Sequence, residues 1–390
     1  KVRQARKALG EQEPLLMDTP PGDEHAPLHH EHERINAPTG DELIKVREAL
    51  AEARQRLQNA IADEVHYRLR YDPIDGFENY LRYAEGAFQA HAESLDMQLR
   101  DELLQYLDQA EPEDKALIED RATWDLAVRW VKRYIAKREY ATAIETAGRL
   151  RTEAGTRMQA LGLLADAELN ILKGWALAYQ GTNLDEAEMT LGRALEILKR
   201  SQPEPETIDN WQHDRLMANA YNLLGYVRRQ RGRSQDAVRY YRGALPFWRA
   251  LKNEQEHATT LNNLAMALAE VGDLNQALRY CSDGLAMRRR LGPRYPIALS
   301  LNTMGLIEVR YDHLHRAKEY CERALAIFTE MEQPRGVGLA GIAAAETLRR
   351  TAERAGIHTP YEQGALLRDA EKYARTAVEI FSSKDDPKKK

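Results

Sequence analysis

The chain has 390 residues, of which 30% are charged and 43% are hydrophobic, and its formal net charge is −5. A charge this small for the length gives no global field that would attract nucleic acid or an anionic membrane. The sequence contains no run of 18 apolar residues, so we expect neither a membrane span nor a membrane partner. Two cysteines are too few for a disulfide framework, and a reduced, cytoplasmic location is expected.

Residues 1–40 contain prolines, histidines and acidic residues without apolar periodicity. Such a composition buries too little apolar surface to offset the entropy of ordering, so a flexible arm is expected. A cluster of histidines and glutamates in the arm comprises His25, His29, His30, Glu31, His32 and Glu33. Its spacing matches no catalytic zinc motif, and a linker is favoured over a metal site.

The chain begins with Lys1 instead of methionine and ends in a charged tail, residues 381–390. We interpret it as part of a longer polypeptide. Removal of an initial methionine is the simpler alternative.

Residues 41–119 are expected to form a helical adaptor that fits no repeat. Thr39 offers an N-cap, and apolar residues then follow three-and-four spacing as far as Tyr71, which predicts one long amphipathic helix. Pro73 ends it, because proline lacks a backbone donor and restricts the residue before it. Further helices are predicted at 76–93, 96–109 and 113–138.

The C-terminal part of the chain, residues 120–380, contains a repeat. Small residues recur at intervals of 40 at two positions of the unit: Gly225, Ala265 and Gly305, and Ala237, Ala277 and Ala317. A fixed period in this range is typical of a helical solenoid, in which each unit buries its apolar face against its neighbours. No segment has the pattern of a β-strand, so we predict an all-α fold.

Three less regular units are predicted in addition to these three regular ones, which gives about six helix pairs in total. One begins near Trp124, and the next contains Gly174 and Gly181. A loop rich in proline and acidic residues is expected from Gln202 to Asp214. In the last unit the second helix is displaced by an insertion that contains Gly356, Pro360 and Gly364.

The pattern resembles the tetratricopeptide repeat (TPR), in the long-helix form of about 40 residues seen in kinesin light chains and in sensor domains of bacterial STAND-type signalling proteins. The residues that carry the resemblance are Leu224-Gly225, Gly232, Ala237, Tyr241 and Ala244-Leu245, with Leu261 to Ala265 and Asn302 to Gly305 in later units. It covers about residues 120–380 and implies a right-handed α-solenoid of helix pairs. Asp312 departs from the pattern, because it replaces the glycine of a turn.

An asparagine ladder is the main candidate binding feature: Asn222, Asn262 and Asn302 stand one period apart. The resemblance places them on the first helix of each unit, which lines the concave surface. A side-chain amide can pair with both the N–H and the C=O of an extended peptide. Alternatively, these asparagines bond between neighbouring helices and fix repeat packing. Projection onto the same surface adds Tyr226, Arg229, Met266, Leu306, Val309 and Arg310.

Other polar clusters are expected to be structural. The arginines of residues 228–233 and 288–290 stand at helix ends, where cations complement the helix dipole, and they form no aromatic-interleaved stripe for nucleic acid. Cys281 and Cys321 take the position of Tyr241 in the repeat, which predicts buried packing residues. No nucleotide-binding or hydrolase motif occurs, so we expect no enzyme activity, no cofactor and no metal.

The resemblance implies a module that binds a protein or peptide in its concave groove, as the sensor or partner-recognition part of a larger bacterial signalling protein. An upstream effector or nucleotide-binding domain of the same polypeptide would be a further partner. Two alternatives stay open. One is a regulator similar to Rap proteins, acting on a response regulator under peptide control. The other is a structural scaffold or oligomerisation array.

Overall fold

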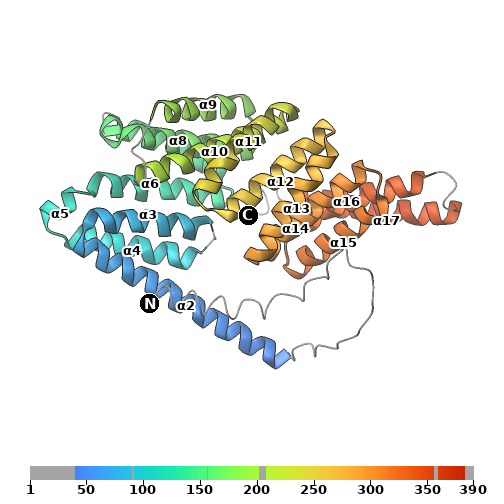
Figure 1. The fold of residues 1–390 in the computed structure, drawn as a ribbon, viewed down its shortest axis with the longest axis horizontal. Helices are drawn as coiled ribbons and strands as arrows, with labels where there is room; N and C mark the ends of the chain where they lie inside the picture. Colours follow the sequence, from blue (N-terminus) through green and yellow to red (C-terminus); the bar gives the residue numbers. More distant parts are fainter. Residues whose placement is uncertain (1–39, 90–91, 156, 202–207, 355–358, 383–390) are drawn as a thin grey trace. The chain divides into compact units, whose positions relative to one another are not determined.

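The computed structural model describes residues 40–89, 92–155, 157–201, 208–354 and 359–382, and every regular element within them is a helix (Figure 1). The all-α prediction is therefore confirmed. The chain divides into two compact units, residues 1–130 (unit 1) and 131–390 (unit 2). The predicted arm, its histidine cluster and most of the C-terminal tail lie outside the described residues.

Unit 1 is built from helices that follow one another with short connections: α2 (Gly40–Tyr71), α3 (Pro73–Gln89), α4 (Glu93–Gln109), α5 (Pro112–Ala116) and the first part of α6 (Glu119–Ala136). The end of α2 at Tyr71 confirms the predicted stop. The second helix starts earlier than predicted because Pro73 occupies its first turn, where the missing donor costs nothing.

The single helix predicted at 113–138 is wrong. Two helices, α5 and α6, are separated by a turn at Leu117 and Ile118. This turn lets Ile118 enter the core, where it is 3% exposed, while Leu117 remains 54% exposed. Apolar burial outweighs the local preference for a continuous helix.

The turn between α2 and α3 is tight. The carboxylate of Asp72 accepts hydrogen bonds from the backbone N–H groups of Ile74 and Asp75, each at 3.1 Å. Gly76 then packs directly on the end of α2, where an added Cβ would lie 2.3 Å from the backbone nitrogen of Leu69. The hairpin therefore depends on a residue without a side chain at this position.

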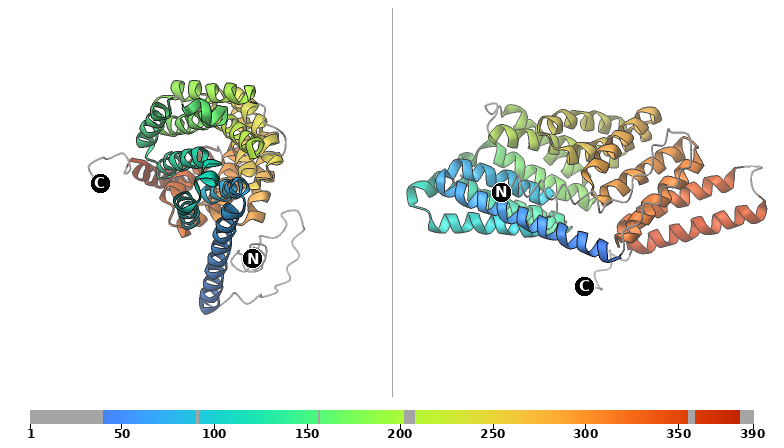
Figure 2. Two further views of the ribbon diagram at one scale, coloured as in Figure 1. Left: turned by 90° about the vertical axis from the view of Figure 1, so that its left-hand side faces the viewer. Right: turned by 60° about the horizontal axis from the view of Figure 1, so that its bottom comes forward.

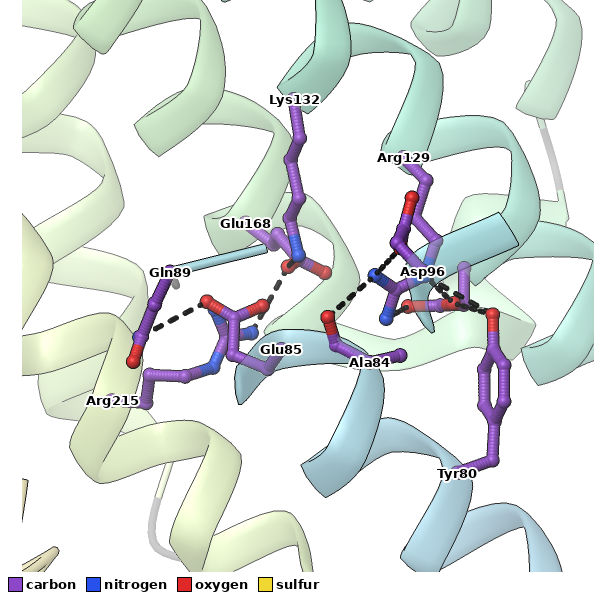
Figure 3. A network of polar contacts seen from close by, with 10 residues as sticks. Tyr80, Ala84, Glu85, Gln89, Asp96, Arg129, Lys132, Glu168 and Arg215 are labelled. Atoms are coloured by element: carbon purple, nitrogen blue, oxygen red, sulfur yellow. Dashed lines mark hydrogen bonds and ion pairs between the residues drawn. The ribbon is translucent and has the colours of Figure 1, made fainter. Parts of the chain in front are cut away.

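A buried polar network holds α3, α4 and α6 together within unit 1 (Figure 3). Arg129 is 3% exposed and donates to Asp125 at 2.6 Å and to Asp96 at 3.2 Å. Its guanidinium also reaches the carbonyl of Ala84 at 3.2 Å, and the hydroxyl of Tyr80 donates to Asp125 at 2.9 Å. Burial opposes the charge of Arg129, but Asp125 and the other nearby anions outweigh it and raise its pKa well above the ordinary value.

Unit 2 begins within α6 and continues as a succession of helix pairs. After α6 they are α7 (Tyr140–Ala154), α8 (Arg157–Gln180) with α9 (Leu184–Arg200), α10 (Ile208–Gln230) with α11 (Ser234–Ala250), α12 (Glu254–Val271) with α13 (Leu274–Leu291), α14 (Arg294–Arg310) with α15 (Leu314–Glu330), and α16 (Pro334–Glu353) with α17 (Pro360–Ser382). Consecutive pairs pack side by side (Figures 1 and 2), which confirms the helical solenoid for the described residues. Close pairing is seen for α8 with α9, α10 with α11, α12 with α13, α14 with α15, and α16 with α17, so five of the roughly six predicted pairs are confirmed there.

The predicted loop from Gln202 to Asp214 is partly wrong, because α10 already begins at Ile208. One contact with α9 and one contact within α10 involve the N-terminal part of this helix. His213 lies 3.0 Å from the carbonyl oxygen of Leu198 in α9, and the guanidinium of Arg215 stacks over the ring of Trp211. The last unit also differs from expectation, because Gly364 lies inside α17 and does not belong to an insertion loop.

Small residues recur because paired helices approach closely at these points. A Cβ added to Gly225 would lie 2.7 Å from the ring of Tyr241, and one added to Gly305 would lie 2.6 Å from the sulfur of Cys321. Both partners are fully buried. The 40-residue period is therefore a packing requirement of the helix pair.

The turns between helices share one backbone conformation. A left-handed residue occurs at two positions of the repeat, with φ from 51° to 95°: Gly232, Gly272 and Asp312, and Lys252, Gly292 and Glu332. Asp312 has φ 64°, so this departure from the glycine pattern leaves the turn geometry unchanged.

Both cysteines are free and fully buried, as predicted. Burial raises the pKa of Cys281 to about 12 and that of Cys321 to about 11, from an ordinary value of 9.0. We expect neither thiol to react with a disulfide reagent in the native protein at pH 8, and both to react after unfolding in urea. A native reaction as fast as that of a free thiol would contradict this burial.

The same thiols predict a pH dependence of stability. Above pH 9 the unfolded thiols lose their protons while the folded ones keep them, so stability falls between about pH 9 and pH 11. The slope is up to about 1.4 kcal/mol per pH unit for each thiol. The measurement is the urea midpoint at pH 8 and at pH 10. The fall in midpoint between these two pH values should be smaller for the double variant Cys281→Ala, Cys321→Ala than for the wild type.

Candidate functional site

The ladder asparagines differ in exposure. Asn222 is half-buried, and its side-chain oxygen accepts a long hydrogen bond of 3.5 Å from Asn263 of the neighbouring pair. Asn262 is 9% exposed and lies 3.9 Å from the sulfur of Cys281 in the second helix of its own pair. Asn302 is 7% exposed, and its side-chain oxygen has no hydrogen-bond partner among the described residues. Contact between this ladder and a ligand stays a prediction.

The other predicted groove residues also lie in different surroundings. Met266 and Leu306 are half-buried, and Leu306 packs beside Cys321. Val309 is 3% exposed, whereas Arg310 is exposed. Arg229 forms an ion pair of 2.8 Å with Glu270 of α12, so its charge is already partnered.

Three aromatic side chains of the array lie in a row of ring contacts, here called the tyrosine row: Tyr140, Tyr179 and Tyr226. The rings of Tyr179 and Tyr226 are stacked, with centroids 4.8 Å apart and planes inclined by 18°. The ring of Tyr140 lies 6.3 Å from that of Tyr179. The row thus joins α7, α8 and α10 and includes one residue predicted for the groove, Tyr226.

Several neighbouring groups act electrostatically on Tyr179. Its side chain is 46% exposed, yet the surrounding protein removes enough water to raise its pKa far above 10. Glu256 of α12 raises this pKa further, and Arg335 of α16 lowers it. Arg335 also lowers the pKa of Tyr140, which burial raises. Charges from later pairs of the array therefore act on the row.

A second polar cluster in unit 2 is buried and structural (Figure 3). The carboxylate of Glu168 lies 3.0 Å from the Lys132 ammonium and 3.0 Å from the Arg215 guanidinium. The side chains of all three residues are at most 12% exposed. The cluster links α6, α8 and α10 and leaves little of these groups open to a ligand.

Sequence reasoning missed Tyr140 and Tyr179. The period of 40 breaks between α8 and α10, so these positions do not align with the regular units. One signal was available: Trp175 follows Gly174 as Tyr226 follows Gly225. Tyr179 is one helical turn beyond Trp175 and hence on the same helix face, with the two rings 6.3 Å apart.

Two kinds of site are not found among the described residues. No three or more His, Cys, Asp or Glu side chains there are grouped so that they could hold a metal ion. None of the helices in those ranges is long and apolar enough to cross a membrane.

Comparisons with known proteins support the fold. The tetratricopeptide repeat family model matches residues 216–290 and 256–330. A Rap protein solved in complex with Competence and Sporulation Factor is 15% identical, with a TM-score of 0.54 over 78% of this chain and 77% of that one. BtubC (BKLC) from P. vanneervenii is 22% identical, with a TM-score of 0.43 over 65% of this chain and 92% of that one.

A STAND protein with a tetratricopeptide repeat sensor from Pyrococcus horikoshii is 15% identical, with a TM-score of 0.47. That match covers 87% of this chain and 54% of the STAND protein. None of the curated proteins that were compared matches the sequence. The Rap structure, with a TM-score of 0.54, supports the fold alone, and at 15% identity it leaves function to be argued from the surface. Residues 216–330 thus match the tetratricopeptide repeat family, and the helix pairs of unit 2 have the architecture of its long-helix form.

Proposed function

We propose that this protein is a recognition module that holds a protein or peptide segment against the tyrosine row. The supporting observation is the stacked pair Tyr179 and Tyr226, whose ring centroids are 4.8 Å apart, together with the 46% exposure of Tyr179. Tyrosine suits such a role because it supplies a large apolar face and a polar hydroxyl at low cost in side-chain entropy. Glu256 and Arg335 would add charge selectivity at the edges.

In this proposal the array acts as the sensor or partner-recognition part of a larger bacterial signalling protein in the cytoplasm. The polar groove residues predicted from the sequence, above all Asn222 and Arg310, would extend the contact along the array. A tetratricopeptide fold is an interaction scaffold, which fits a role in recognition without catalysis. An effector or nucleotide-binding domain in the same polypeptide would receive the signal.

The test is capture of partners from lysate by the wild type and by Tyr179→Ser, followed by mass spectrometry and measurement of affinity for each partner. A tyrosine at the centre of an interface contributes about 2 kcal/mol, so we expect the affinity to fall roughly 10- to 100-fold. Met189→Ser on α9 is the matched control, because Met189 is 70% exposed and lies outside the row. Equal affinities for all three proteins would contradict the proposal.

A second candidate function is regulation of a response regulator under the control of a peptide, as in Rap proteins. The match to the Rap structure covers 78% of this chain, which is more than unit 2 alone. The test is to mix the protein with a phosphorylated receiver domain and measure the loss of phosphate. Loss of phosphate that stops when a short peptide binds the tyrosine row would favour this function over binding alone.

A further inference from the structure

Arg288 is a buried cation at a position where the repeat otherwise has an aromatic residue. Trp248 stands one period before it and Phe328 one period after it, and both are fully buried. Arg288 is itself only 4% exposed. Phe328 packs on Gly336 and Ala340 of α16, so its ring fills the interface between one helix pair and the next. At the equivalent interface, between α13 and α14, a guanidinium takes the place of the ring.

Arg288 reaches its neighbours through uncharged groups. Its Nη1 donates to Ser300 Oγ at 2.8 Å and to the carbonyl oxygen of Pro296 at 2.9 Å, both on α14. Its Nη2 donates to Thr259 Oγ1 of α12 at 3.3 Å. The Nε atom is buried and has no hydrogen-bond partner in the part of the chain that the structure describes. One donor of this buried group is therefore unsatisfied, which is unfavourable.

No carboxylate compensates the charge of Arg288 within the described ranges. Two other buried arginines, Arg129 and Arg215, both pair with carboxylates. Burial lowers the pKa of Arg288 to about 10 from an ordinary value of 12.5, and Cys281 and Glu256 oppose this only in part. A buried charge without a close opposite charge is costly, so this interface contains a destabilising residue.

The connection from α13 to α14 lacks a hydrogen bond that closes the equivalent connections. The N–H of Asn253 donates to the carbonyl oxygen of Trp248 at 3.1 Å, and the N–H of Gln333 donates to that of Phe328 at 2.9 Å. Pro293 takes this position after α13 and has no N–H. The contact between α13 and α14 is also less extensive than that between α11 and α12 or between α15 and α16.

These features lower the free energy needed to separate α13 from α14. Separation of α15 from α16 would expose the ring of Phe328 to water, which opposes opening. Separation of α13 from α14 would return the guanidinium of Arg288 to water, which favours opening. Met304 and Ile307 pack with Cys281 and keep the interface closed in the native state. Because each pair of an array contacts only its neighbours, local opening begins at weakly coupled interfaces.

We propose that the interface between α13 and α14 is an opening point of the array, where the helices up to α13 separate transiently from α14 and the helices after it. Asn262 lies before this interface and Asn302 lies after it. Opening therefore changes the distance between two of the predicted groove positions, and a ligand that contacts both would hold the interface closed. The proposal concerns motion of the array and does not depend on the proposed function.

The two free cysteines report on two equivalent interfaces. The sulfur of Cys281 lies 3.6 Å from the carbonyl oxygen of Ser300 in α14. The sulfur of Cys321 lies 4.0 Å from Thr347 Oγ1 in α16. The measurement is the rate of alkylation of each thiol in the full chain, at urea concentrations below global unfolding, with each site assigned by peptide mass spectrometry.

The main variant is Arg288→Met with Ser300→Ala, which removes the charge and its hydroxyl partner and keeps an unbranched side chain. We expect alkylation of Cys281 to slow at least roughly 10-fold, because an apolar group of similar volume often stabilises a site where it replaces a buried charge. Alkylation of Cys321 should not change. If Arg288 were an ordinary stabilising contact, the same variant would speed alkylation of Cys281. Arg279→Met is the control, because Arg279 lies on the same helix and is exposed.

The reciprocal variant transfers the polar pair to the next interface. Phe328→Arg with Ala340→Ser should speed alkylation of Cys321 at least roughly 10-fold and leave Cys281 unchanged. Circular dichroism checks that each variant is folded. Unchanged or faster alkylation of Cys281 in the folded variant Arg288→Met with Ser300→Ala would overturn the proposal.

Hydrogen exchange of the wild type in urea gives a readout that needs no variant. Peptides from α12 and α13 should lose protection at a different urea concentration from peptides of α14 and α15. In Arg288→Met with Ser300→Ala the two midpoints should move together. A single midpoint for all four helices of the wild type would show that this interface does not open by itself, and would overturn the proposal as well.

Discussion

Replacement of Arg129 by alanine is expected to destabilise unit 1 by about 3–5 kcal/mol. Asp125 and Asp96 are 7% and 9% exposed, and both would lose the cation that compensates their burial. The change also removes a donor from the carbonyl of Ala84 and leaves a cavity where the guanidinium lay. A loss of this size is a large fraction of the stability of an ordinary domain.

The loss of stability should be measured separately for each unit, because the two units need not unfold together. Hydrogen exchange in urea, followed on peptides from α3 and α6, should show earlier opening in Arg129→Ala, while peptides from α12 and α13 keep their wild-type midpoint. Arg56→Ala is the control, since Arg56 is 76% exposed and its pair with Glu52 contributes little. A midpoint shift no larger than that of the control would show that the network does not stabilise unit 1.

Gly76→Ala should cost about 3 kcal/mol, at the upper end of the range for overpacked sites. The added methyl group would lie 2.3 Å from the nitrogen and 2.5 Å from the Cα of Leu69, which are backbone atoms of α2. A side chain could rotate away from such a clash, but a helix backbone moves only as a whole. The hairpin of α2 and α3 must therefore open, and the thermal midpoint of unit 1 should fall.

Gly86→Ala is a matched control in the same helix and is expected to have the opposite sign. A Cβ at Gly86 would meet no atom within 4 Å. Alanine in an open helix interior is favoured over glycine by about 0.5–1 kcal/mol, so this variant should be slightly more stable than the wild type. Equal midpoints for Gly76→Ala and Gly86→Ala would rule out steric contact with Leu69 as the reason for glycine.

The fold could be predicted because its signals are local and repeated. Pro73 marks the junction of α2 and α3, and the spacing of Gly225 and Gly305 reports a packing constraint that each helix pair obeys separately. The boundary of α10 was predicted less well. Its N-terminal part contacts α9 through His213 and Leu198, which belong to different helices and have no periodic pattern.

The site was harder to predict for a physical reason. Periodicity tells which residues share a face, but exposure depends on how the next pair covers that face. Asn222 is half-buried and Asn302 is 7% exposed, although the two are equivalent in the repeat. The network around Arg129 likewise joins three helices at spacings that follow no motif.

The recurrent left-handed residue of the turns separates the geometry of the array from its specificity. Gly232, Gly272 and Asp312 adopt the same backbone conformation, although their side chains differ in size and charge. The path of the backbone is thus determined by the turns and by the small residues where paired helices contact each other. The outward-facing residues of the helices do not determine it. The same backbone could therefore carry many different sets of surface residues. Repeat units could also be duplicated or exchanged between such arrays without a change in the turns.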